Sequence, residues 1–458
     1  MQLAVFLFFI FIAFFIGKNA GSINPAKLII FIFSLIVVFI TFINPVKAVI
    51  ILIFSMLFSP EIGVGKIPGR EVVVRYDDIL LVLIFLIWLL KSAVVKKEPF
   101  LIKTPFQLPL FLYTSVYVLS SFLGILRGDL IWQKVFFYVL KVIEYYLMYF
   151  MVVNILKDEK NFYKYLKYGV IVLIIVVIYS YYYYFNSSGE FVRTTAPFEA
   201  PLNKPQESEP ASLGGYYLLC MGIILALISE VRGKKALFLM LLIVFIYPSF
   251  LLTFSRASYM GFIALFLTFL FFVKKKKPFF IITSFFIFSF SILLPGVGEK
   301  VRMRIKSTYE GGEARNLVVT PFGIVKLEDS AYARYRSIEN VILNVLPNYP
   351  LLGKGVTGIG LGDNQYSLLL GETGITGFLL FLWLIYSILN ISLKVYNKSE
   401  DIYERSIGLG VFCATIGFLV QSLGVNTFII VRIMEPYWFS LALLSLSYLK
   451  INKYLLKS

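Results

Sequence analysis

Long apolar runs separated by short polar segments fill most of the chain. A membrane-crossing helix needs about 20 mostly apolar residues, and runs close to this length recur from one end of the sequence to the other. Because three of the runs are short, the expected number of spans is about 12–14. The predicted spans are 2–16, 27–43, 45–59, 78–91, 108–126, 135–156, 168–185, 212–229, 235–253, 257–273, 278–294, 370–393, 406–425 and 434–450. This pattern predicts an all-α, polytopic membrane helix bundle.

Lysine and arginine residues gather in alternate connections between the predicted spans. The basic clusters lie at 91–103, 157–167, 232–235, 274–277, 394–398 and 450–457. Alternating spans place all of these clusters on one side, which the positive-inside rule identifies as the cytoplasmic side. Both termini are then expected in the cytoplasm, and Asn44-Pro45 is expected to begin a new helix as an N-cap followed by proline.

Composition agrees with a membrane protein and excludes several functions. Hydrophobic residues make up 59% of the 458 residues, and the mean hydropathy is +0.84. The net charge of +17 is concentrated at span ends, which favours contact with anionic lipid over nucleic acid. With no histidine in the chain, histidine-based metal sites and general bases are excluded. Cys220 and Cys413 both fall inside predicted spans, so no disulfide framework is expected.

Two features of the chain set its expected organisation. The apolar N-terminus lacks a basic leader and a small-residue cleavage site, so we interpret it as a first span and not as a signal peptide. Three longer connections, 60–77, 186–211 and 295–369, lie on the side opposite the basic clusters. The expected units are N-terminal spans 1–185, central spans with an outer loop 186–294, a large extracytoplasmic loop 295–369 and C-terminal spans 370–458.

The 295–369 loop has its own secondary-structure signals. Residues 316–325 predict a short hairpin around Pro321-Phe322-Gly323. Residues 330–346 predict an amphipathic helix. The apolar face of this helix is expected to contain Tyr335, Ile338, Val341, Ile342 and Val345. The loop is therefore expected to form a small, partly helical cap.

The most polar, glycine-rich run in the chain, 350–377, follows this helix and leads into an apolar span. Gly353, Gly355 and Gly358 match the G-x-G-x-x-G spacing, but neither a strand before them nor an acidic residue after them supports a dinucleotide site. The glycines are interpreted either as a tight turn that packs its backbone closely or as direct substrate contacts.

Asp363 is the most interesting residue of this run. A carboxylate just before a span is either a solvated helix cap or a general base at the mouth of a cavity. The surrounding pattern favours the general base, presented at the helix mouth across from Arg256.

Arginines in the outer connections are candidate phosphate ligands. Arg256 follows Ser255 between two apolar helices, where an arginine either extends to the interface or holds phosphate oxygens with its planar guanidinium group. Arg193, in the 186–211 connection, is a candidate for the same role. Two arginines facing a diphosphate suit a reaction in which a diphosphate leaves.

Charged residues elsewhere are most simply structural. Lys141 and Glu144 are spaced to form an ion pair facing the bundle interior, with a proton relay as the alternative. Asp77 and Asp78 are interpreted as caps of the span that they begin, with a divalent-cation site as the alternative.

The succession of motifs resembles the O-antigen ligase and polymerase superfamily of bacterial cell-surface polysaccharide enzymes. The resemblance covers residues 190–395 and is carried by the outer motifs in their order along the chain. These motifs are Arg193 with Pro197-Phe198 and Asn203, Ser255-Arg256, Ala333-Arg334, Pro350-Leu351-Leu352-Gly353-x-Gly355, Asp363-Asn364-x-Tyr366 and Glu372-x-Gly374-Ile375-x-Gly377.

The resemblance implies a metal-independent, cofactor-free glycosyltransferase in the bacterial inner membrane. Such enzymes transfer a glycan from undecaprenyl diphosphate to an acceptor glycan at the outer face of that membrane, and a chain-length regulator is a further conceivable partner. The resemblance implies diphosphate binding by Arg193, Arg256 and Arg334, catalysis by Asp363, and a substrate loop. The substrate-loop residues would be Gly353, Gly355, Asn364, Tyr366 and Glu372.

One departure from the family pattern decides between its members. In the ligases a histidine usually precedes Asn-x-Tyr, and Asp363 stands there in this chain. This difference favours a repeat-unit polymerase of the exopolysaccharide type. The alternatives are a ligase that transfers finished glycan to lipid A core or protein, and a polysaccharide transporter or flippase without catalysis. No internal duplication supports the transporter.

Overall fold

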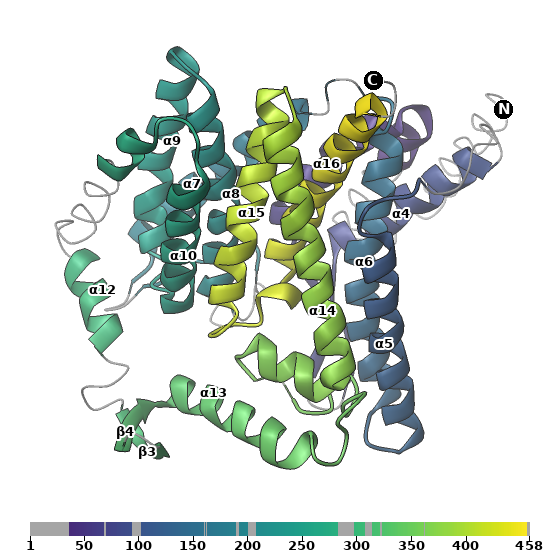
Figure 1. Ribbon diagram of the computed structural model, residues 1–458. Coiled ribbons are helices and arrows are strands. Elements are labelled where there is room, and N and C mark those ends of the chain that lie inside the picture. The colour runs from purple at the N-terminus through teal and green to yellow at the C-terminus, as the bar shows by residue number, and fades with distance from the viewer. Residues whose placement is uncertain are drawn as a thin grey trace, which may run out of the picture.

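The fold is a bundle of long apolar helices with a small helical and β-hairpin layer at one end (Figure 1). The described residues of this computed structural model are 36–67, 70–93, 102–159, 161, 163–188, 192–199, 208–282, 297–306, 314–320, 323–360 and 362–455. Its apolar helices are α3 (Pro45–Phe58), α4 (Tyr76–Lys91), α5 (Gln107–Leu126), α6 (Trp132–Leu156), α7 (Lys164–Asn186), α8 (Pro210–Glu230), α9 (Lys234–Leu251), α10 (Arg256–Phe272), α14 (Gln365–Lys398), α15 (Ile402–Gln421) and α16 (Val431–Leu455).

Eleven of the predicted spans correspond to these helices. The predicted spans 2–16, 27–43 and 278–294 lie wholly or largely outside the described residues. Within the described residues, seven helices are long and apolar enough to cross a membrane. The chain is therefore an all-α, polytopic membrane protein. The expected helix start at Asn44-Pro45 is confirmed, since the Asn44 side chain accepts a hydrogen bond from Val46 N.

Helices α8 and α15 form the centre of the bundle, where most of their residues are buried. Without water to drive association, membrane helices depend on close packing at small residues. A Cβ atom at Gly261 of α10 would lie 2.8 Å from the carbonyl oxygen of Gly417 in α15. Glycine at this position therefore permits the two backbones to approach directly.

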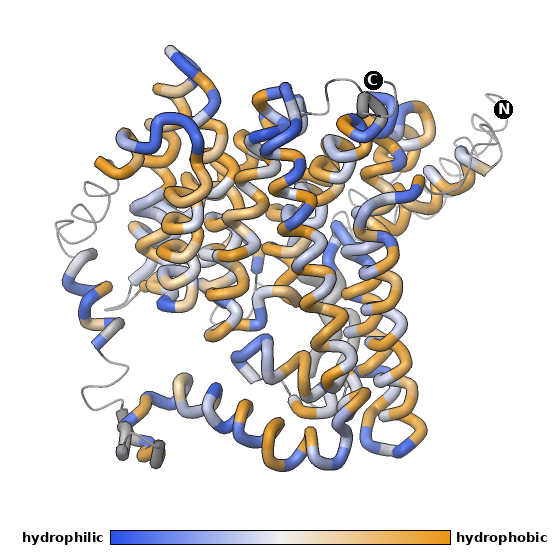
Figure 2. The backbone as a smooth tube through the Cα atoms, in the orientation of Figure 1, coloured by the Kyte–Doolittle hydropathy of each residue, from blue (hydrophilic) through white to orange (hydrophobic). Residues whose placement is uncertain are grey.

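Polar residues concentrate at the two ends of the bundle (Figure 2). At one end, which we call the basic end, Glu230 accepts hydrogen bonds from Lys275 and Arg405, both at 2.6 Å. Three of the basic connections predicted to be cytoplasmic contribute residues to this end: Lys274, Asn397 and Lys450, the last near the end of α16 (Figure 1). The grouping agrees with the alternation expected from the sequence.

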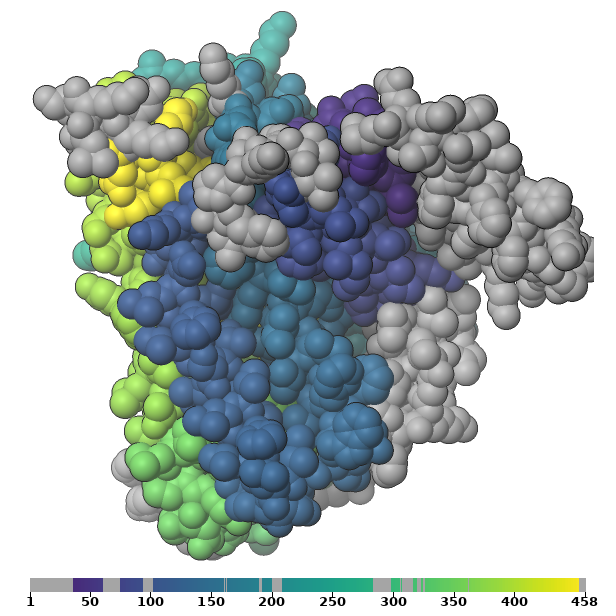
Figure 3. Space-filling model, turned by 90° about the vertical axis from the view of Figure 1, so that its right-hand side faces the viewer, coloured from purple at the N-terminus to yellow at the C-terminus, as the bar shows by residue number. Residues whose placement is uncertain are grey.

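The opposite end, which we call the cap end, carries the described residues between 297 and 364 (Figure 1). Strands β3 (Ala314–Thr320) and β4 (Gly323–Glu328) form the predicted antiparallel hairpin. Helix α13 (Asp329–Asn340) and a π-helical turn (Val341–Val345) form the predicted amphipathic helix. Figure 3 shows the green residues of this region meeting the blue residues of α5 and α6 at the lower end of the bundle.

Two details of this end differ from expectation. Val341 and Val345 are buried on the expected apolar face, but Ile338 and Ile342 are exposed. The 60–77 connection, predicted only as a loop, contains a second hairpin of β1 (Glu61–Ile67) and β2 (Arg70–Arg75).

Candidate functional site at the cap end

A sharp kink in α14 shapes the floor of the cap end. Gly374 has φ 65° and ψ −168°, a conformation that breaks the helix. The segment Pro350–Gly355 runs across this break and forms four backbone hydrogen bonds with residues 371–376. Two of them, Lys354 N to Gly371 O at 2.8 Å and Ile375 N to Pro350 O at 2.9 Å, lie on either side of the break. We call this contact the kink junction.

Gly353 is required by the kink junction for two reasons. Its φ of +67° lies in the left-handed region, which favours glycine. A Cβ atom there would also lie 2.6 Å from the backbone of Glu372 and of Gly374. Gly355 is buried in the same way, against Ser120 and Ser121 of α5. Of the two roles expected for these glycines, the structure shows the closely packed turn.

The remaining predicted substrate-loop residues also hold the kink junction or its helix. Glu372 is buried, and its Oε1 accepts a hydrogen bond from Thr357 N at 2.6 Å. Asn364 caps α14 by accepting from Tyr366 N and Ser367 N, both at 3.0 Å. The Tyr366 hydroxyl donates to Leu419 O at 2.6 Å. These side chains therefore fix the position of the residue just before the helix.

Asp363 immediately precedes the Asn364 cap and is exposed. Because Asn364 performs the capping, the cap that was considered for Asp363 is not its role in the structure. Its carboxylate influences Arg334 of α13 and Glu209, the residue before α8.

Four arginines from separate elements gather around this carboxylate and its neighbours. Arg193 lies in the 192–199 segment, Arg256 begins α10, Arg304 lies in α12 (Val297–Lys306) and Arg334 lies in α13. We call these four residues the arginine cluster. The sequence predicted three of them as diphosphate ligands, and the structure brings these three to the same end of the bundle with Arg304.

Electrostatic effects connect three members of the cluster with the neighbouring carboxylates. Burial and the Arg304 guanidinium group lower the pKa of Arg193. Burial also lowers the pKa of Arg334, where Arg304 adds to the decrease and Asp363 opposes it. The surrounding protein and the Asp363 carboxylate raise the pKa of Glu209. Like charges held this close favour an anion between them.

Neighbouring elements hold three of these guanidinium groups in place. Arg193 Nε donates to Thr253 O at 3.3 Å, and Arg334 Nε donates to Gly424 O at 3.0 Å. Arg256 forms an ion pair with Glu328, which also lies 3.8 Å from Arg304 Nη1. Arg256 therefore links α10 to β4.

The local backbone adds to the positive potential. Helices α8, α10 and α14 all begin at the cap end, with Ser255 and Asn364 as side-chain caps of the last two. The N-terminus of a helix carries a partial positive charge that favours anions. The arginine cluster and these helix N-termini place positive charge beside the exposed Asp363 carboxylate.

Sequence reasoning missed Glu209 and Arg304 as members of this site. Arg304 lies in a basic run that looked like a solvated surface, and Glu209 lies in a polar loop with other acidic residues. The only available signal was the adjacency of Glu209 to a proline that begins a span.

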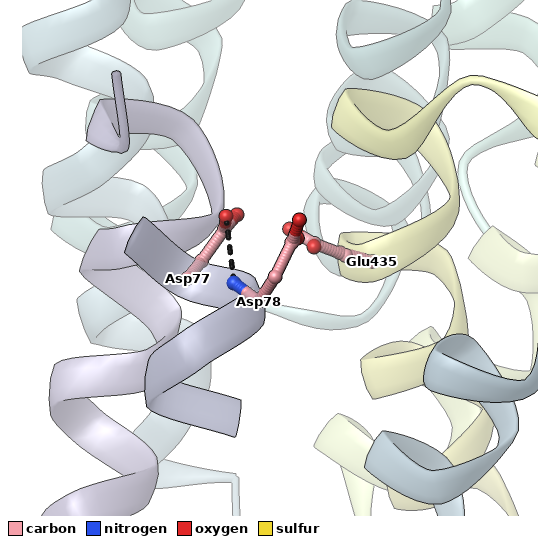
Figure 4. A group of neighbouring side chains, drawn as sticks. All are labelled: Asp77, Asp78 and Glu435. Atoms are coloured by element: carbon pink, nitrogen blue, oxygen red, sulfur yellow. Dashed lines mark hydrogen bonds between the residues drawn. The ribbon is translucent and has the colours of Figure 1, made fainter. Parts of the chain in front are cut away.

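A second charged group lies deeper in the bundle, between α4, α6 and α16 (Figure 4). The predicted Lys141–Glu144 ion pair is present at 3.0 Å, and Lys141 also bonds to Asp78 at 2.5 Å. The capping role of Asp78 is confirmed, because its Oδ2 accepts from Arg75 N at 3.0 Å. Asp77 forms an ion pair with the Arg75 side chain.

No family model and no curated protein sequence matches this chain. Its fold class therefore rests on its own helices, and its function is argued from the cap-end site.

Proposed function

We propose that this protein is a metal-independent membrane glycosyltransferase that polymerises glycan repeat units carried on undecaprenyl diphosphate. The proposal is supported above all by one observation. The arginine cluster, which suits a diphosphate, lies beside an exposed carboxylate at the end of the bundle opposite the basic clusters. The proposal places this end at the outer face of the bacterial inner membrane, with both termini in the cytoplasm.

In this proposal the diphosphate of the lipid-linked donor occupies the arginine cluster. Arg193, Arg304 and Arg334 contribute positive charge, and Arg256 keeps β4 and α13 in position through Glu328. A guanidinium group offers paired donors to phosphate oxygens. The charge on the diphosphate increases as it leaves, so these contacts stabilise the transition state more than the ground state.

The acceptor hydroxyl is placed next to Asp363. The hydroxyl oxygen forms a bond with the anomeric carbon of the donor while the bond from that carbon to the diphosphate oxygen breaks. The Asp363 carboxylate takes the hydroxyl proton, and undecaprenyl diphosphate leaves with the electron pair. Attack from the side opposite the leaving group inverts the anomeric configuration. The kink junction and the Asn364 cap hold the start of α14, and so the backbone next to Asp363, in place.

Lipid-linked intermediates in a deletion strain test this function. We expect single lipid-linked repeat units to accumulate at the outer face, because polymerisation is the missing step. Accumulation of finished lipid-linked polymer would contradict the polymerase and identify a ligase. Accumulation of repeat units at the cytoplasmic face would identify a transporter.

A further inference from the structure

The charged group between α4, α6 and α16 has more negative than positive members. The cationic side chains are Arg75, Lys141 and Arg432, and the carboxylates are Asp77, Asp78, Glu144 and Glu435. Glu199 in the nearby 192–199 segment adds a further carboxyl group, whose pKa burial raises to about 7. We call the seven residues, without Glu199, the α4–α16 network. With all seven groups ionised, the network would carry one uncompensated negative charge.

Glu435 is the least satisfied member of this network. Its side chain is 2% exposed, and neither carboxylate oxygen accepts a hydrogen bond. Arg75 Nη2 lies 3.6 Å from Glu435 Oε2, outside hydrogen-bond distance. Carboxylate oxygens of Asp77, Asp78 and Glu435 all lie within 4.8 Å of one another, and Figure 4 shows Glu435 extending towards the two aspartates.

Two of the three cationic groups are also partly used elsewhere. Arg432 donates to Met56 O at 3.1 Å, to Ser59 O at 2.7 Å and to Phe198 O at 2.8 Å. Arg75 Nη2 donates to Met56 O at 2.9 Å, whereas Nε and Nη1 of Arg75 are buried without a hydrogen-bond partner. These guanidinium groups therefore satisfy the carbonyl oxygens at the end of α3 as well as the carboxylates.

A buried carboxylate without a donor is costly inside a membrane protein. The cost disappears when one positive charge joins the three clustered carboxylates. We propose that Asp77, Asp78 and Glu435 form a binding site for one small monovalent cation, either a proton or Na⁺. A proton would neutralise the Glu435 carboxylate and Na⁺ would bind its oxygens, and either would balance the charge of the network. This inference does not depend on the proposed glycosyltransferase activity.

A hydrogen bond connects the helix that carries Glu435 to the cap end. Arg432, three residues before Glu435, bonds to the carbonyl of Phe198 in the segment that carries Arg193. Phe198 has φ 54°, an uncommon conformation for a side chain of this size. The 192–199 segment therefore contacts the helix of the proposed cation site through Phe198 and contributes Arg193 to the arginine cluster.

Thermal unfolding of the full-length protein in lipid nanodiscs tests the cation site. One arm varies NaCl against choline chloride at constant pH and ionic strength, and the other varies pH without Na⁺. We expect the melting temperature of the wild type to rise with Na⁺ in a saturable way, or to fall as pH rises in the second arm. The first response identifies Na⁺ and the second a proton.

The Glu435→Gln variant identifies the residue responsible. Glutamine resembles a neutralised glutamate, so this variant should fold and lose the response. Glu404→Gln is the matched control, because Glu404 is equally buried but accepts from Lys450 and Ser399, both at 2.6 Å. The control should be destabilised and keep the response of the wild type. Equal responses of Glu435→Gln and the wild type in both arms would overturn the proposal.

A binding measurement on the wild type covers the case in which Glu435→Gln does not fold. We expect either saturable binding of radioactive Na⁺ or an infrared band of a protonated carboxyl group that disappears as pH rises. The absence of both signals would overturn the proposal without any variant.

Discussion

Replacing Gly353 by alanine probes the kink junction on which the position of Asp363 depends. The left-handed backbone costs about 1–2 kcal/mol with a Cβ atom. The new Cβ would meet backbone atoms of Glu372 and Gly374 at 2.6 Å, which cannot rotate away. Overpacking of this kind costs about 1–3 kcal/mol. The two costs together should lower the free energy of unfolding by about 2–5 kcal/mol.

Gly128→Ala provides the matched control for this substitution. Gly128 has a similar φ of +78° and lies between α5 and α6, but a Cβ atom there would meet nothing within 4 Å. Alanine at this position should therefore lower the free energy of unfolding only by the cost of the left-handed backbone, about 1–2 kcal/mol. Unfolding by titration of a denaturing detergent into mixed micelles measures both. Equal losses for the two variants would refute the close approach of Pro350–Gly355 to the break in α14.

Three further substitutions test the surrounding contacts. Arg334→Ala removes a cation from the arginine cluster and should weaken sulfate binding by about tenfold, as expected for the loss of a charge-assisted hydrogen bond. Unchanged sulfate affinity in a calorimetric titration would exclude Arg334 from the anion site. Because the pKa of Glu209 is raised, its carboxylate takes up a proton at a higher pH than an ordinary glutamate, so sulfate affinity should increase as pH falls. Glu209→Gln should remove this dependence and bind sulfate more tightly at neutral pH, and a wild-type pH profile in the variant would contradict the assignment. Ser120→Ala removes the hydrogen bonds from its hydroxyl to Leu352 O and Glu372 O and should cost about 1–3 kcal/mol; unfolding in mixed micelles at the wild-type midpoint would argue against them.

The bundle could be predicted from sequence because its signal is local. A run of apolar residues long enough to cross a membrane has few alternatives to a helix, and lysine clusters order the connections. The β3–β4 hairpin and α13 were predictable for the same reason, since turn residues and helical periodicity are read over short windows.

The contacts that define the two charged sites are not local. Glu435 meets Asp77 and Asp78 across more than 350 positions of sequence, and no spacing rule joins them. The sequence analysis selected Arg256, Arg334 and Asp363 as site residues. It did not predict that Glu328 would form an ion pair with Arg256. A lone arginine at a helix start indicates a need for an anion and does not indicate which carboxylate satisfies it.

The glycines of 350–377 show a different limit. Their spacing correctly indicated an unusual backbone, and the structure explains Gly353 and Gly374 by a break in α14. Whether such glycines approach a substrate or another backbone depends on what lies beside them. The sequence pattern alone contains no information on this point.

The elongation of lipid-linked glycan by purified protein tests the central claim most directly. We expect the wild type to convert repeat units on undecaprenyl diphosphate into longer chains without added metal, and Asp363→Asn to lose this activity while still binding sulfate. Asp129→Asn is the control at the same end, because Asp129 pairs with Arg127 at 2.9 Å and should retain activity. Full-length polymer from Asp363→Asn, or no elongation by the wild type, would contradict the account.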